Sequence, residues 1–261
     1  MKHTFENSFH IIETESYKLK LAVPPCTSFL FCKHTARLFA FAAGGDCTVS
    51  GKNDVILETS EWNVTENTDG SLRCSRDEKS PVWQKKRFII EAADSALEYY
   101  HELEGEGALE EIRYFRCCVN EDEFGFAGDF DEVYSVAPNF REQKYFHPSS
   151  QFLISFGNDI SPVTGAHALA SVPHVAGLHD RRDKGCLAVG VFAMPGEYMW
   201  DEFVWNPAVI NSPTNYHGDD TMAGGFAIRY FGKKQIDGAW TTPRLCMTFP
   251  DDYEDTLKNS L

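Results

Sequence analysis

The chain has 261 residues, 43% of them hydrophobic and 24% charged, a composition that excludes a collagen-like fibre and a disordered chain. Its formal net charge is −15, from 39 acidic and 24 basic residues spread along the sequence. A surface of this sign repels phosphate groups, so we expect neither nucleic acid nor an anionic membrane as a partner. The length suits one large all-β domain.

Short runs of aromatic and β-branched residues, separated by Gly, Pro, Asn and Asp, predict a succession of antiparallel strands. In chain order, the expected strands cover residues 9–23, 48–50, 55–58, 87–92, 97–103, 112–119, 152–156, 187–194 and 225–230. Turns are expected at residues 51–54, 67–70 and 104–107, where glycine supplies the positive φ that a reversal needs. The pattern predicts an all-β fold, a large antiparallel β-sandwich over residues 1–249.

Three segments lack this alternation. Residues 161–183 and 206–224 are long and rich in Pro, Gly, His and Asn, and long irregular segments in a compact domain are often functional. Residues 250–261 instead predict a short helix, with Asp251 or Asp252 as its cap and Tyr253, Leu257 and Leu261 on one face. We expect this helix to begin a connection toward a missing catalytic domain.

The eight cysteines show no CxxC pair and no spacing typical of a disulfide framework, so we expect buried free thiols. The first residues contain no apolar stretch like that of a secretory signal, and no segment reaches the roughly 18 apolar residues of a membrane span. Both features predict a cytoplasmic protein. In that setting the sequon at Asn63, Val64 and Thr65 is interpreted as a chance match.

No group of residues has the spacing of a catalytic or metal-binding motif. His167, His174 and His179 do not match the spacing of zinc ligands, and no cysteine pair completes a site. Asp129 and Asp131 could form an acid and base pair or hold a cation, but a solvated edge or turn is the favoured interpretation of the acidic residues 121–132. A nucleophile elbow and a phosphate-binding glycine motif are also missing. The sequence therefore predicts no catalytic residue, no metal and no cofactor.

Aromatic and polar residues gather between residues 198 and 220. Sugar rings stack their C–H faces on aromatic side chains while Asp, Asn and His bind the hydroxyl groups. The candidate sugar-binding residues are Trp200, Asp201, Trp205, His217, Asp219 and Asp220. The alternative, which we favour from the sequence, is that the two tryptophans pack in the core or against another domain.

The order of four segments resembles a known family. They are residues 83–88 (WQKKRF), 97–107 (LEYYHELEGEG), 112–115 (IRYF) and 240–245 (WTTPRL). The first three resemble the amino-terminal β-sandwich of retaining α-glycosidases, the α-glucosidase and α-galactosidase-like glycoside hydrolases of families thirty-one and thirty-six. The fourth, with the expected helix at residues 251–255 (DDYED), is similar to the passage that leads from that sandwich into the catalytic barrel. The resemblance covers most of residues 50–261 and implies a galactose-mutarotase-like supersandwich that packs on a (β/α)₈ barrel. The catalytic carboxylates of that family lie on the barrel, so it assigns no catalytic role to any residue here.

Three functions remain as hypotheses. The first is a non-catalytic sandwich module of an α-glycosidase, which supports the barrel and contacts an α-linked sugar. The second is a free-standing carbohydrate-binding protein that uses the segment from Trp200 to Asp220. The third is an enzyme of the aldose epimerase type, with His147, His174 or His217 as general acid, although no spacing selects among them.

Overall fold

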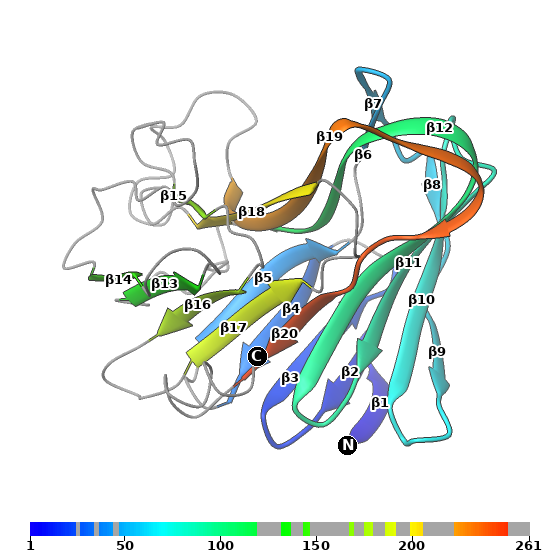
Figure 1. Ribbon diagram of the computed structural model, residues 1–261. Coiled ribbons are helices and arrows are strands. Elements are labelled where there is room, and N and C mark those ends of the chain that lie inside the picture. Colours follow the sequence, from blue (N-terminus) through cyan, green and yellow to red (C-terminus); the bar gives the residue numbers. More distant parts are fainter. Residues whose placement is uncertain are drawn as a thin grey trace.

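The computed structural model describes residues 1–24, 27–33, 37–43, 47–118, 132–136, 143–146, 167–169, 175–179, 186–191, 199–205 and 222–249. Every regular element within these ranges is a β-strand, and each strand pairing is antiparallel (Figure 1). The predicted all-β class is therefore confirmed. No helix in the described part of the chain has the length and hydropathy needed to cross a membrane.

The strand pairings arrange the described strands in two sheets. The first sheet runs in the order β9 (Asn63–Glu66), β10 (Leu72–Lys79), β11 (Lys85–Ala92), the first half of β12 (Ala96–Cys118), β20 (Leu245–Thr248), β17 (Cys186–Val191), β16 (Val175–His179), β13 (Glu132–Val136) and β14 (Gln143–Phe146). A short strand, β8 (Glu58–Thr59), also pairs with β10.

The second sheet runs in the order β1 (Lys2–Glu6), β2 (Phe9–Glu13), β3 (Tyr17–Ala22), β4 (Thr27–Cys32), β5 (Arg37–Ala43), the second half of β12, β19 (Met222–Thr241), β18 (Met199–Trp205) and β15 (His167–Leu169). A hairpin of β6 (Cys47–Val49) and β7 (Lys52–Asp54) joins the same half of β12 through β6.

The long strands β12 and β19 belong to both sheets. They pair from Glu102 opposite Thr241 to Cys118 opposite Met222, with three irregularities in register, and arch together over the top of the molecule (Figure 1). Gly105 and Gly238 lie opposite each other in the bend, with φ of 135° and 94°. Bulges and positive-φ glycines bend a strand pair without ending it, so the two sheets remain one hydrogen-bonded structure.

This arch corrects one sequence prediction. Residues 97–103 and 112–119 were expected to be successive strands separated by a turn at 104–107, but Ala96–Cys118 is one strand. Gly105 allows the strand to bend, through its positive φ, and Gly107 allows Trp83 to pack closely against the strand. A Cβ on Gly107 would lie 3.0 Å from Cη2 of Trp83.

A second correction concerns the hairpin of β6 and β7. The turn falls at Ser50 and Gly51, which have φ of 50° and 75°, so the predicted turn residues 52–54 form a strand and residues 55–57 do not. The turn expected at residues 67–70 is confirmed, since the Asn67 amide bonds the Ser71 carbonyl. The strand expected at 152–156 and the helix expected at 250–261 lie outside the described residues.

The core lies between the inner faces of the two sheets. Ile12, Leu19 and Leu21 of the second sheet share one buried cluster with Ile90 and Tyr99 of the first. Alternation along each strand points every second side chain into this layer, which explains why short alternating runs were sufficient to predict the sandwich. Phe249, which follows β20, also belongs to this core: its side chain is 5% exposed, and its ring centroid lies 5.0 Å from that of Tyr17 on β3.

Four cysteines can be assessed. Cys32, Cys47 and Cys74 are buried free thiols and Cys246 is a half-buried one, which confirms the predicted chemistry for these four. Burial raises the pKa of Cys47 to about 12 and that of Cys246 to about 11. Both sulfurs are therefore protonated and weakly reactive at neutral pH.

Candidate functional site

The structure places half of the predicted sugar-binding residues. Trp200, Asp201 and Trp205 lie on β18, where Trp200 pairs with Arg229 and Trp205 with Gly224 of β19. On the other side of β18, His167 of β15 pairs with Trp205, so two of the segments singled out from the sequence are neighbours in one sheet.

The other candidates cannot be placed. The residues outside the described ranges are His217, Asp219 and Asp220 of the sugar-binding set, His147 and His174 of the epimerase hypothesis, and Asp129 and Asp131 of the acidic stretch. Their roles stay predictions.

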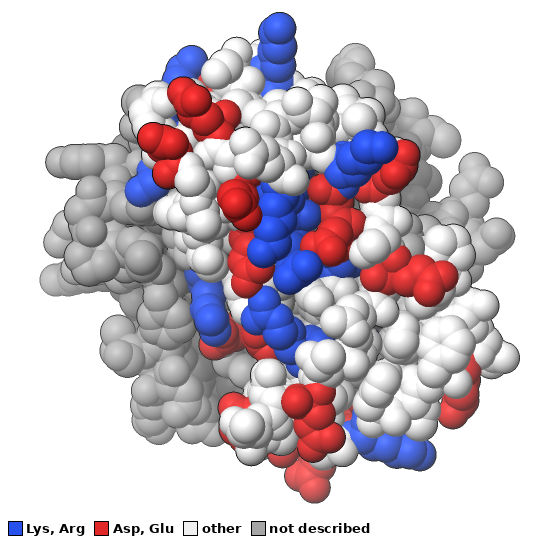
Figure 2. All heavy atoms as spheres, turned by 90° about the vertical axis from the view of Figure 1, so that its right-hand side faces the viewer, with Lys and Arg blue, Asp and Glu red and all other residues white. Residues whose placement is uncertain are grey.

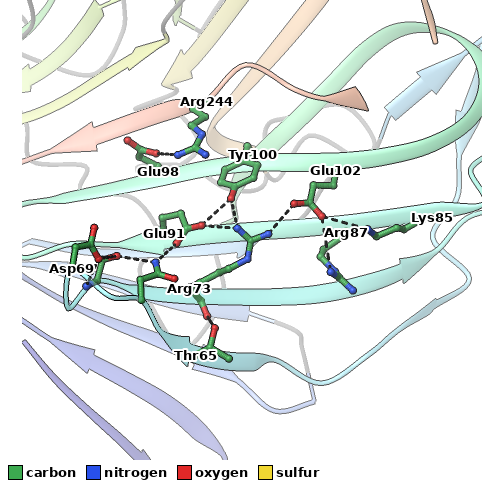
Figure 3. A network of polar contacts seen from close by, with 12 residues as sticks. Thr65, Asp69, Arg73, Lys85, Arg87, Glu91, Glu98, Tyr100, Glu102 and Arg244 are labelled. Atoms are coloured by element: carbon green, nitrogen blue, oxygen red, sulfur yellow. Dashed lines mark hydrogen bonds and ion pairs between the residues drawn. The ribbon is translucent and has the colours of Figure 1, made fainter. Parts of the chain in front are cut away.

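The most extensive polar arrangement among the described residues covers the outer face of β10, β11 and β12 (Figure 3). Its centre is Arg73, whose Nη1 donates to Oε1 of Glu91 at 2.7 Å and whose Nη2 donates to Oε1 of Glu102 at 2.8 Å. The Tyr100 hydroxyl donates to the same Glu91 oxygen at 2.8 Å and accepts a further hydrogen bond from Arg73. Asn67 donates to the second oxygen of Glu91 at 3.1 Å.

Further ion pairs extend the arrangement in two directions. Arg244 donates to Glu98 at 2.6 Å, and its guanidinium carbon lies 4.5 Å from the Tyr100 ring centroid. Arg73 contacts the same ring at 5.7 Å, so cation–π contacts add to the ion pairs. On the other side, Lys85 lies 3.6 Å from Glu102, and Arg87 pairs with Asp77 at 2.7 Å. We call these residues the surface charge network: Arg73, Asp77, Lys85, Arg87, Glu91, Glu98, Tyr100, Glu102 and Arg244.

Strand register explains why these side chains meet. Arg73 lies opposite Glu91, which lies opposite Glu98, and Arg87 lies opposite Glu102. Directly opposed residues on neighbouring strands share one face of the sheet, about 5 Å apart. The sequence indicated that Lys85, Arg87 and Glu91 share one face of a strand, because they are separated by even intervals. It did not indicate which strands lie beside this one, and so which residues pair with these three side chains.

The surface charge network has four cations and four carboxylates, so it is neutral on a chain of net charge −15. Figure 2 shows acidic and basic side chains next to one another across the middle of this face. Burial and the hydrogen bond to Glu91 raise the pKa of Tyr100 to about 12, so its hydroxyl stays protonated. Because Tyr100 is only 2% exposed, its ring is not open to stack on a sugar.

A second polar group lies on the inner face of the same strands. Lys86 is fully buried and its Nζ donates to Oδ2 of Asp54 at 2.8 Å and lies 3.8 Å from Oε2 of Glu78. Arg76 donates to the other oxygen of Glu78 at 2.8 Å, and Ser80 donates to Asp54 at 2.6 Å. We call Asp54, Arg76, Glu78 and Lys86 the buried charge cluster. Burial lowers the pKa of Lys86, but Cys47, Glu78 and Asp54 outweigh it and raise that pKa above its ordinary value.

His101 lies beside this cluster and is also fully buried. Its Nε2 is 3.2 Å from the Arg113 carbonyl oxygen, while its Nδ1 has no hydrogen-bond partner among the residues that the structure describes. Burial, followed by the charge of Lys86, holds the pKa of His101 well below 6.5, so the imidazole is neutral. It packs against the ring of Phe88 at 4.8 Å and acts as a core residue.

The four segments that carry the family resemblance come together here. The segment 83–88 leads into β11, which pairs with residues 97–104 of β12. The crossing from β19 to β20 is held against β12, because the Thr242 amide donates to the His101 carbonyl at 2.9 Å and the Tyr114 hydroxyl donates to the Pro243 carbonyl at 2.7 Å. The resemblance therefore follows one contiguous part of the fold.

We expect the replacement of Tyr100 by Phe to lower the free energy of unfolding by about 1 kcal/mol, since it removes the hydroxyl bonds to Glu91 and Arg73 and keeps the ring. Urea denaturation measures the change. Thr65→Val is the matched control, because the Thr65 hydroxyl is exposed and donates to the backbone carbonyl oxygen of Arg73 at a long 3.5 Å. Equal losses in both variants would contradict a cooperative network around Tyr100.

Comparisons with known proteins rest on structure alone. No protein-family model and no curated protein sequence matches this chain. An α-N-acetylgalactosaminidase, NagBb from Bifidobacterium bifidum, superposes with a TM-score of 0.57 at 6% identity, over 95% of this chain and 37% of that one. A galactose mutarotase related enzyme from Lactobacillus acidophilus superposes with a TM-score of 0.50 at 10% identity, over 93% and 97%.

At these identities the similarity establishes the fold alone, a galactose-mutarotase-like β-sandwich, as the family resemblance implied. This chain spans little more than a third of the glycosidase and almost the whole of the mutarotase-related enzyme. Neither comparison distinguishes glycoside hydrolase families thirty-one and thirty-six from others that contain such a sandwich.

Proposed function

We propose that this chain is the non-catalytic β-sandwich module of an α-glycosidase, which packs on a catalytic (β/α)₈ barrel and contacts an α-linked sugar from the β18 side. The observation that carries the proposal is the surface charge network. Its carboxylates already hold arginine or lysine partners, as Glu91 and Glu102 illustrate, so neither is a free acid or base for catalysis.

The same face has properties suited to covering another domain. Its paired charges leave no net charge, so a second domain can approach without facing the surplus of acidic groups elsewhere. Arginine is enriched at protein interfaces, and side chains already held by Arg73 and Arg244 lose little conformational freedom when they are covered. The structural similarity to part of a much longer glycosidase further supports this proposal.

The decisive assay uses the isolated 261-residue chain with aryl α-glucosides and α-galactosides. We expect no release of the aryl group above the rate of a heat-denatured sample, because retaining hydrolysis needs two carboxyl groups about 5 to 5.5 Å apart, which the barrel would supply. Turnover by the pure chain would overturn the proposal. An open reading frame that continues past Leu261 into a barrel would support it.

The second candidate is a free-standing sugar-binding protein or mutarotase. It is favoured by the match over almost the full length of the mutarotase-related enzyme and by the pairing of His167 with Trp205. Polarimetry of sugar mutarotation distinguishes a mutarotase from the first proposal, because a non-catalytic module should leave the uncatalysed rate unchanged. Calorimetric titration with galactose and glucose, repeated on Trp200→Ala and Trp205→Ala, tests the sugar contact at β18 that both proposals share. Catalysed mutarotation by the pure chain would favour this second function.

A further inference from the structure

Two histidines on the first hairpin lie close together at the edge of the second sheet. In the register of β1 and β2, Phe5 pairs with His10 and His3 pairs with Ile12, so His3 and His10 are diagonal neighbours across the two strands. Nε2 of His3 is 3.2 Å from Nδ1 of His10, and the two rings stack with their centroids 5.4 Å apart. Phe5, 58% exposed, packs its ring 4.9 Å from that of His10.

This separation suits the chelation of one metal ion. Two imidazole nitrogens, each about 2.1 Å from an ion and subtending an angle between that of an octahedron and that of a tetrahedron, lie about 3.0 to 3.4 Å apart. The observed 3.2 Å falls within this interval. Neutral imidazole is a common ligand of Zn²⁺, Ni²⁺ and Cu²⁺.

From this geometry we propose that His3 and His10 form a two-histidine site for a borderline divalent transition-metal ion, Zn²⁺ in the first instance. The ion replaces the proton that the two nitrogens share, and that proton moves to the outer nitrogen of its own ring. Within the described residues no third histidine, cysteine or carboxylate completes a cluster, so water occupies the remaining coordination positions.

The charge around the pair favours a cation. Burial and the neighbouring His3 lower the pKa of His10, and Glu61 opposes them, which places the Glu61 carboxylate within electrostatic reach of the pair. The net charge of the whole chain, −15, acts in the same direction. The sequence did not predict this site because His3 and His10 are separated by the turn between β1 and β2.

The test is titration of the wild-type chain with ZnCl₂ by calorimetry, alongside His3→Ala and His10→Ala. We expect the wild type to bind one more equivalent than either variant, or to bind the same equivalent at least tenfold more tightly. Thr4→Ala is the matched control, since residue 4 lies between the face positions 3 and 5 on the same strand, and it should bind as the wild type does.

A second measurement keeps the result interpretable. Zn²⁺ should raise the thermal unfolding temperature of the wild type and of Thr4→Ala, and raise it less in both histidine variants, because an ion that binds only the folded chain stabilises it. Identical Zn²⁺ binding and identical thermal shifts in the wild type and both histidine variants would overturn the proposal. The outcome is independent of the glycosidase proposal, which concerns another face of the molecule.

Discussion

Replacing Lys86 by Met should lower the free energy of unfolding by about 3 to 5 kcal/mol, the largest effect we expect from a single substitution in this chain. The methionine is close in length to lysine but carries no charge. Asp54 is 1% exposed and Glu78 is 3% exposed, so both carboxylates would stay buried without the ammonium group that lies between them. Uncompensated buried charge is far more costly than a lost surface ion pair.

Lys79→Met is the matched control for this experiment. Lys79 pairs with Glu58 at 3.0 Å, but both side chains are more than half exposed, so its loss should change stability by about 1 kcal/mol or less. Guanidinium chloride denaturation of the two variants and the wild type gives the comparison. Similar losses in both variants would show that the buried charge cluster does not stabilise the sandwich in the way proposed here.

The second large effect is a dependence on pH that His101 causes. Its pKa in the folded chain is well below 6.5, mainly because it is buried and secondly because of Lys86. In the unfolded chain it takes up a proton as the pH falls below about 6.5, while the folded chain does not. Stability must therefore decrease on acidification through this window by about 1.4 kcal/mol per pH unit, until the pH reaches the lowered pKa of the folded state.

The measurement is urea denaturation between pH 8 and pH 5 for the wild type and for His101→Gln. Glutamine has no such protonation and keeps a donor for the Arg113 carbonyl, so the variant should lose about 2 kcal/mol less than the wild type between pH 6.5 and pH 5. Thr4→Ala removes no group that titrates in this window and should retain the wild-type slope. If His101→Gln and the wild type have parallel profiles, the imidazole is not held neutral in the core.

The sequence predicts in part which side chains of the first sheet point toward the core and which point outward. Lys86 has the same parity as Phe88 and Ile90, so strand alternation alone places it toward the core, and Arg87 has the parity of the outer face. What alternation could not supply is the partner. Asp54, which neutralises Lys86, lies 32 positions earlier in the chain, beyond a turn that was itself placed two residues too late.

The sequence also predicted a turn inside a segment that the structure shows to be one continuous strand. Gly105 and Gly107 indicated a turn because glycine is the usual residue at reversals, yet they lie in the bend of the continuous strand β12. The conformational freedom of glycine permits both a chain reversal and a bend within a strand. The residues packed against the glycines determine which of the two forms, and here Gly238 opposite Gly105 and Trp83 against Gly107 favour a bent strand.

The sequence by itself determined the all-β class, the approximate positions of strands such as β11 and β17, and the free, buried thiols of Cys32, Cys47 and Cys74, since each depends on local alternation or residue chemistry. Only the tertiary structure decided which strands pair, that β12 and β19 join the two sheets, and that Arg73 meets Glu91, Glu102 and Tyr100. It also brought His3 to His10. These contacts depend on register between segments, and register is set by the shared burial of whole strands, which no single segment specifies.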